Sequence, residues 1–156
     1  MATKITLLVT VLAYSFIVSQ SFMYILALKN VQLHMDGKSY TAFRQLIDTN
    51  MRNNFKYVLY TAVFANIILL VLNGRQPGSL LFITAAIALV ALIADIVITV
   101  KGSLPVNDII NGWSPDNYPT NWTEFRDKWL RIFYYRQVIN ITGFISLLIG
   151  VIFRSR

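Results

Sequence analysis

Four long runs of apolar residues divide the chain, and they predict four membrane-crossing helices. The run at residues 80–100 is 21 residues long and contains one ionisable side chain, Asp95. A helix of about 20 residues, rising ~1.5 Å per residue, crosses the ~30 Å hydrocarbon layer of a bilayer. We therefore expect one all-α domain over residues 1–156, an integral membrane four-helix bundle with spans at about 5–28, 55–73, 80–100 and 130–153.

Two polar connections, 29–54 and 101–128, lie at the same end of the predicted bundle, which we call the long side. The opposite end, the short side, holds both chain termini and the turn 73–78. Within the first connection, Ser39 reads as an N-cap. The residues after it recur at helical spacing and predict an amphipathic segment that runs into the second span. That segment could lie on lipid headgroups or cover the mouth of the bundle.

The second connection is a Trp-rich loop, because it holds all three tryptophans of the chain: Trp113, Trp122 and Trp129. Tryptophans mark membrane interfaces, which explains part of this enrichment. It does not explain why the short side has none.

Composition agrees with a membrane protein and excludes several other classes. Hydrophobic residues make up 56% of the chain and charged residues 13%, about half the share in soluble proteins. With no cysteine there are no disulfides or thiolate sites, and a single histidine excludes a multi-histidine metal site within one chain. The net charge of +7 contains no basic block that suggests nucleic acid. The expected partner is the lipid bilayer, and no cofactor is predicted.

The orientation in the membrane stays open. Ten of the 14 lysines and arginines lie on the long side, which would place that side in the cytoplasm. The same connections also hold six of the seven acids, and some of their arginines look directed toward a site.

Every predicted span carries a strongly polar residue. Counted from the long side at ~1.5 Å per residue, Asp95 is ~9 Å deep and Arg136 ~10 Å deep, and Gln20, Asn66 and Asn140 are ~13–16 Å deep. The sequence therefore predicts a polar pocket that opens to the long side, with Asp95 and Arg136 as an ion pair and apolar packing below. The alternative is that these residues only join the helices, at under ~2 kcal/mol per contact.

Small residues support close helix packing beside this pair. Thr84, Ala88 and Ala91 share a helix face with Asp95, and Asn140 and Gly143 share one with Arg136, continuing near Ser146 and Gly150.

His34 allows three interpretations. It could bind a metal with carboxylates from elsewhere, such as Asp108 or Glu124. It could act as an acid–base group at the edge of the site, or it could be an ordinary surface residue.

The stretch 104–140 resembles the anthrone oxygenase-like family of small four-span membrane proteins. The family has a P-x-N-D-like element after its third span, then W-x-x-x-R-x-x-W and an arginine about seven residues later. The matching positions in this chain are Pro105, Asn107, Trp122, Arg126, Trp129 and Arg136.

This resemblance implies oxidation of a phenolic polycyclic substrate by O₂ without metal or flavin. In that case Asp95 or His34 would take a proton, while Arg136 and Asn140 would hold the resulting anion. Aromatic side chains would stack on the rings: Trp113, Trp122, Trp129, Tyr134 and Tyr135. The candidate catalytic residues are thus Asp95, Arg136 and His34. The candidate ligand-binding residues are Gln20, Asn66, Asn107, Trp113, Trp122, Arg126, Trp129, Tyr135 and Asn140.

Three function classes remain open. The first is a membrane protein that binds a small, hydrophobic or aromatic molecule in the pocket, with a cofactor-independent oxygenase as the enzymatic form of this class. The second is a non-enzymatic membrane subunit or binding protein whose long loops dock a partner. The third, an ion-coupled carrier, is weaker because the chain has no repeat, although a homo-oligomer could supply one.

Overall fold

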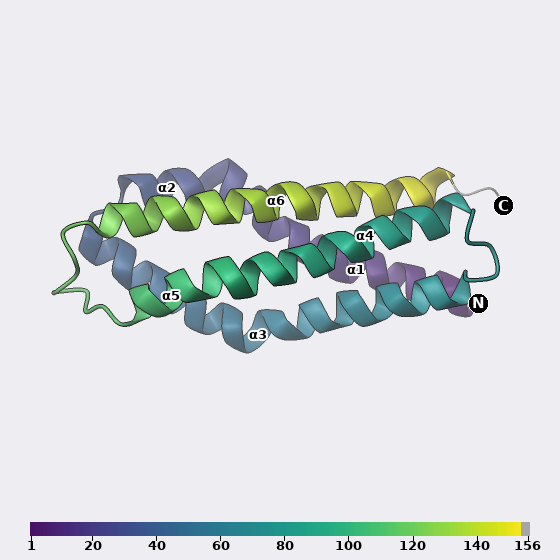
Figure 1. Cartoon of the computed structure of the whole chain (residues 1–156), viewed down its shortest axis with the longest axis horizontal. Helices are drawn as coiled ribbons and strands as arrows, with labels where there is room; N and C mark the ends of the chain where they lie inside the picture. Colours follow the sequence, from purple (N-terminus) through teal and green to yellow (C-terminus); the bar gives the residue numbers. More distant parts are fainter. Residues whose placement is uncertain (154–156) are drawn as a thin grey trace.

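In the computed structural model, which describes residues 1–153, the chain forms a bundle of four long helices (Figure 1). These are Ala2–His34, Gly37–Leu72, Leu80–Asn111 and Trp122–Phe153, each long and apolar enough to cross a membrane. The N-terminus and the end of the fourth helix lie at the same end of the bundle, as expected for the short side. Two of the short-side cations counted above, Arg154 and Arg156, lie outside the described residues.

The first and third long helices each contain one π-helical turn. The first consists of α1 (Ala2–Met23), the π turn η1 (Tyr24–Leu28) and α2 (Lys29–His34). The third consists of α4 (Leu80–Ile98), the π turn η2 (Thr99–Ser103) and α5 (Leu104–Asn111). The other two are α3 (Gly37–Leu72) and α6 (Trp122–Phe153). Both π turns lie toward the long side. Single π turns inside α-helices often occur at functional sites.

The prediction of two long connections is wrong in part. The first helix continues to His34 and the third to Asn111, so only residues 35–36 and 112–121 of the long side lie outside helices. Polar residues such as Lys29 and Lys101 suggested that the helices end there. The two helices instead continue through these polar residues and beyond the apolar zone, because helical hydrogen bonding does not depend on apolar side chains.

The start of α3 also differs from the prediction. Asp36, not Ser39, is the N-cap: its carboxylate accepts a hydrogen bond from the Ser39 backbone N–H at 2.8 Å. This bond from Ser39 lowers the pKa of Asp36, which is exposed. The predicted continuity from the amphipathic segment into the second span is confirmed, since α3 is one helix of 36 residues.

Close packing of small and apolar side chains fills the short-side half. Ala85, Ala88 and Leu92 of α4 are fully buried, together with Leu69 of α3 and Leu147 of α6. The predicted small-residue faces are confirmed by the two glycines of α6. A Cβ on Gly143 would overlap the Tyr14 hydroxyl and lie 2.6 Å from the Ala91 Cβ, and a Cβ on Gly150 would overlap the Thr84 hydroxyl.

Candidate functional site

Aromatic side chains form the core of the long-side half. Trp129 stacks on Phe133 with ring centroids 5.0 Å apart, and Tyr24 of η1 lies 4.3 Å from Phe133. The guanidinium of Arg44 lies 3.8 Å above the Trp129 ring. All four residues are buried. A cation over a desolvated indole is worth about 2 kcal/mol, so this contact fixes Arg44 in place.

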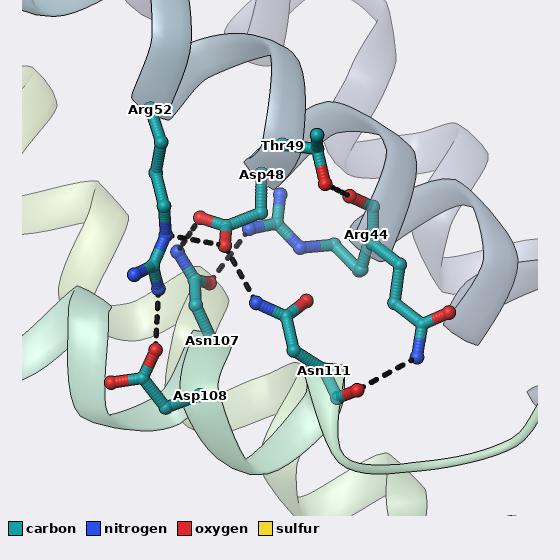
Figure 2. A network of polar contacts seen from close by, with 8 residues as sticks. Arg44, Asp48, Thr49, Arg52, Asn107, Asp108 and Asn111 are labelled. Atoms are coloured by element: carbon teal, nitrogen blue, oxygen red, sulfur yellow. Dashed lines mark hydrogen bonds and ion pairs between the residues drawn. The ribbon is translucent and has the colours of Figure 1, made fainter.

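A polar network joins α3 to α5 (Figure 2). Arg44 donates to the Tyr24 hydroxyl at 3.2 Å and to the Asn107 carbonyl oxygen at 2.9 Å. Asp48, one helical turn after Arg44, accepts from the amide groups of Asn107 at 2.6 Å and Asn111 at 2.7 Å. Both oxygens of this buried carboxylate are therefore occupied.

Two further residues of α3, Arg52 and Gln45, extend this α3–α5 network (Figure 2). Arg52 donates to Asp48 at 2.7 Å and to Asp108 at 2.5 Å. Gln45 donates to the backbone carbonyl oxygens of Ile110 at 3.0 Å and Trp113 at 2.8 Å. The network thereby holds α5 and the start of the Trp-rich loop against α3.

The sequence interpretation missed most of this network. Only Asn107 was among the candidates. The available signal was the spacing of four residues between Arg44, Asp48 and Arg52, which places them on one helix face. The same spacing relates Asn107 to Asn111 on α5.

The predicted ion pair between Asp95 of α4 and Arg136 of α6 is confirmed. The Arg136 Nε donates to one Asp95 oxygen at 2.7 Å and its Nη2 to the other at 3.4 Å, so the contact is two-pronged. The Arg136 Nη1 donates to the Ser103 hydroxyl of η2 at 3.4 Å. Asp95 is only 1% exposed. This arrangement neutralises both charges, and the catalytic roles assigned to the two residues stay predictions.

A pocket of about 260 Å³ lies among Arg136, the α3–α5 network and the aromatic core. We call it the long-side pocket. One part of its lining is polar and comes from α1, α3, η2, α5 and α6: Gln20, Arg44, Asp48, Thr99, Asn107 and Arg136. The other part is apolar and comes mainly from α3: Ile47, Met51, Phe55, Leu59 and Leu104.

Three buried polar atoms of lining residues have no hydrogen-bond partner within residues 1–153. They are the Arg44 Nε, the Thr99 hydroxyl and the Trp129 indole nitrogen. Leaving a buried polar group unpaired costs about 1–3 kcal/mol, and three of the nine such atoms in the described residues belong to side chains that line this pocket. All three groups can donate a hydrogen bond.

The pocket gathers only some of the predicted ligand-binding residues. Gln20, Asn107, Trp129 and Arg136 line it. Asn140 is buried in the bundle but is not part of the lining. Asn66 is also buried and lies six residues before the end of α3, about 9 Å from the short side. It does not line the pocket, and its predicted depth stays a prediction.

The remaining aromatic and basic candidates lie elsewhere. Trp113 packs edge-to-face on Phe125 at 5.3 Å, and Trp122 lies 5.4 Å from Tyr40. These two tryptophans hold the loop together and do not line the pocket. Tyr135 is 56% exposed on the outside of α6, and Arg126 lines a different groove.

His34 ends α2 as an exposed residue, and its Nδ1 lies 2.8 Å from the Asn30 carbonyl oxygen. Of its three interpretations, the structure favours the ordinary surface residue. No group of three or more histidine, aspartate or glutamate side chains in the described part of the chain could hold a metal ion.

Comparison with known proteins identified no similar protein. No family model matches the chain, and neither a curated protein nor a solved structure shows a significant match to it. The function must therefore be inferred from the geometry of the long-side pocket itself.

Proposed function

We propose that the chain is a multi-pass membrane protein whose long-side pocket binds a small molecule with an apolar, aromatic body and an anionic or phenolic oxygen. The membrane placement rests on the four long apolar helices and on the apolar side chains that surround the short-side half. Phe16, Phe64, Val90 and Ile152 are each more than 60% exposed there. Such a surface is stable in lipid and costly in water.

The three unpartnered donors carry the ligand proposal. These three atoms are covered in this structure, so a carboxylate, phenolate or carbonyl oxygen in the pocket would accept their hydrogen bonds after small shifts of the side chains that line it. A cationic ligand would leave them unpaired and add repulsion from Arg44 and Arg136. The hydrogen-bonding pattern therefore favours an acceptor.

The charges around the pocket point the same way. Four cations line it: Arg44, Arg52, Lys56 and Arg136. Arg52 pairs with Asp48 and Asp108, and Arg136 pairs with Asp95, which gives three carboxylates. The cations outnumber these carboxylates by one. A ligand with one negative charge would balance the site, and its apolar body would pack on Met51, Phe55 and Leu104.

Binding is better supported than catalysis. An oxygenase of the kind that the family resemblance implies needs a base to remove a proton from its substrate. Asp48 accepts three hydrogen bonds from Asn107, Asn111 and Arg52, and Asp95 pairs with Arg136. Each of the four oxygens of these two carboxylates already accepts a hydrogen bond from another side chain, so both carboxylates are occupied by structural contacts.

The test compares three ligands of similar size on the purified full-length protein in detergent. We expect 2-naphthoate to bind more tightly than neutral 2-naphthamide, and 2-naphthylmethylammonium not to bind, as measured by quenching of tryptophan fluorescence. Thr99→Val removes one unpartnered hydroxyl at constant shape and should weaken naphthoate binding about three- to tenfold. Equal binding of the cation, or no effect of Thr99→Val, would overturn the proposal.

The matched control is Thr61→Val. Thr61 is exposed on α3 and its hydroxyl already donates to the Tyr57 carbonyl oxygen at 2.8 Å. We expect this variant to bind naphthoate as the wild type does. An equal loss in both variants would mean that the signal does not come from the pocket.

A further inference from the structure

A second cavity, of about 620 Å³, lies on the outer surface between the first helix and α6. We call it the α2–α6 groove. It shares no lining residue with the long-side pocket. Its walls come from residues 24–33 of η1 and α2 and from residues 126–137 of α6.

Two hydrogen bonds between the walls define the ends of the groove. At the outer end, Arg126 donates to the Leu33 carbonyl oxygen at 3.3 Å. At the inner end, Gln137 donates to the Ser21 carbonyl oxygen at 3.0 Å. The two α6 residues are 11 positions apart, so the groove is about 16 Å long.

Polarity changes along this length. The charged lining residues, Lys29, Arg126, Asp127 and Arg131, all lie in the outer part. The lining deeper in the bundle is uncharged and includes Ile25, Phe133 and Tyr134. A phospholipid has the same profile, with a charged headgroup at the interface and an acyl chain directed into the membrane.

Two of the three cations have no carboxylate partner. Arg126 pairs with Asp127 at 2.9 Å, which satisfies the only acid in the lining. Lys29 and Arg131 are exposed, and neither forms an ion pair with any other residue from 1 to 153. The groove therefore presents unbalanced positive charge where its wall changes from charged to apolar.

We propose that the α2–α6 groove binds one anionic phospholipid. Lys29 and Arg131 hold the phosphate and headgroup, and an acyl chain lies along Ile25 and Tyr134. This site uses the membrane placement proposed above but is independent of the ligand in the long-side pocket. A zwitterionic lipid would bind more weakly, because its ammonium group would face the same cations.

The experiment is native mass spectrometry of the full chain released from micelles that contain equal amounts of phosphatidylglycerol and phosphatidylcholine. We expect one phosphatidylglycerol to be retained at least about tenfold over phosphatidylcholine. The double variant Lys29→Gln/Arg131→Gln should lose this preference. The double variant Lys101→Gln/Lys128→Gln, which removes two exposed long-side cations outside the groove, should keep it.

Several outcomes would overturn the proposal. They are no preference in the wild type, an equal loss in both double variants, and displacement of the lipid by inorganic phosphate alone. The last result would indicate a free phosphate site. A mass spectrum that showed a second copy of the chain bound in place of the lipid would identify the groove as a dimer interface.

Two control measurements separate this proposal from the proposed function. Extraction of membranes with alkaline carbonate tests the membrane placement: a chain released into the soluble fraction would refute both proposals. A chain that stays in the membrane but shows no lipid preference would refute the groove alone. Lys29→Gln/Arg131→Gln should bind 2-naphthoate as the wild type does, since neither residue lines the long-side pocket.

Discussion

The two halves of the bundle are held together in different ways. In the short-side half, alanines, glycines and leucines pack directly, and Gly143 and Gly150 let α6 approach α1 and α4 without room for a side chain. In the long-side half, helices meet through buried arginines, carboxylates and amides, and both cavities discussed above lie there. The first half is suited to rigidity and the second to placing polar groups around a ligand.

This difference between the two halves indicates which amino-acid substitutions each half should fail to tolerate. Direct packing fails when any atom is added, because nothing can move aside cheaply. A polar network fails when one partner is removed, because the remaining charge or dipole stays buried without compensation. Each half should therefore respond to its own kind of substitution.

The largest effect is expected for Arg136→Met. This variant leaves Asp95 buried without its partner, and we expect the free energy of unfolding to fall by about 3 kcal/mol. Unfolding in mixed micelles with increasing SDS measures the change. The double variant Asp95→Asn/Arg136→Gln contains no buried unpaired charge and should recover at least half of the loss. Wild-type stability of Arg136→Met would show that the pair does not hold the long-side half together.

A smaller but clear loss is expected for Gly143→Ala on the short side. The added Cβ would overlap the Tyr14 hydroxyl and crowd Ala91, which should cost about 1–3 kcal/mol in the same SDS titration. Gly78→Ala is the matched control, because a Cβ there meets no atom within 4 Å, and we expect it to stay within ~0.5 kcal/mol of the wild type. If Gly143→Ala were harmless, the short-side packing would be looser than described.

The smallest effect concerns pH at the start of α3. The pKa of Asp36 is lower in the folded chain than in the unfolded chain, because its carboxylate accepts the Ser39 N–H. The cap is therefore fully effective above the unfolded pKa of about 4 and is lost as the pH falls through the folded value. Hydrogen exchange in the first turn of α3, corrected for intrinsic rates, should speed up as the pH falls from about 6 to about 3.

Asp36→Asn separates the charge from the cap. Asparagine also caps helices but does not titrate, so the corrected exchange rates of this variant should not change with pH. On the short side, the N-cap of α4 does not titrate in this range: it is Ser79, whose hydroxyl accepts a hydrogen bond from the Phe82 N–H. The same fall in pH should leave exchange there unchanged, and equal acceleration at both ends would contradict the contrast between the two halves.

Each feature that was predictable from the sequence depends on the position or the periodicity of residues within one helix at a time. Asp95 is conspicuous in an apolar run, and counting residues from the long side was enough to find Arg136 at the same depth. The small-residue faces of α4 and α6 follow from the helical repeat. These features need no knowledge of the path of the chain outside the apolar zone.

The features that were missed depend on helices extending beyond that zone. Since 29–34 and 101–111 were expected to be loop, no face could be assigned to Asn107 and Asn111, and Asp48 had no visible partner. Trp113 and Trp122 were assigned to the ligand because the family resemblance implies a polycyclic substrate on which they would stack, whereas the loop needs them for its own packing.

The π turn η2 has a further consequence, which concerns register. At about 100° per residue, an unbroken α-helix would place Asn107 about 120° away from Asp95, and the one extra residue that a π turn accommodates reduces this to about 20°. If 99–103 became regular α-helix at unchanged length, Asn107 and Asn111 would turn by about 100° away from Asp48. A chain that kept every side chain named in the site but lost the π turn would therefore be unable to assemble it, whereas deleting one residue from 99–103 together with the turn would keep Asn107 about 20° from Asp95.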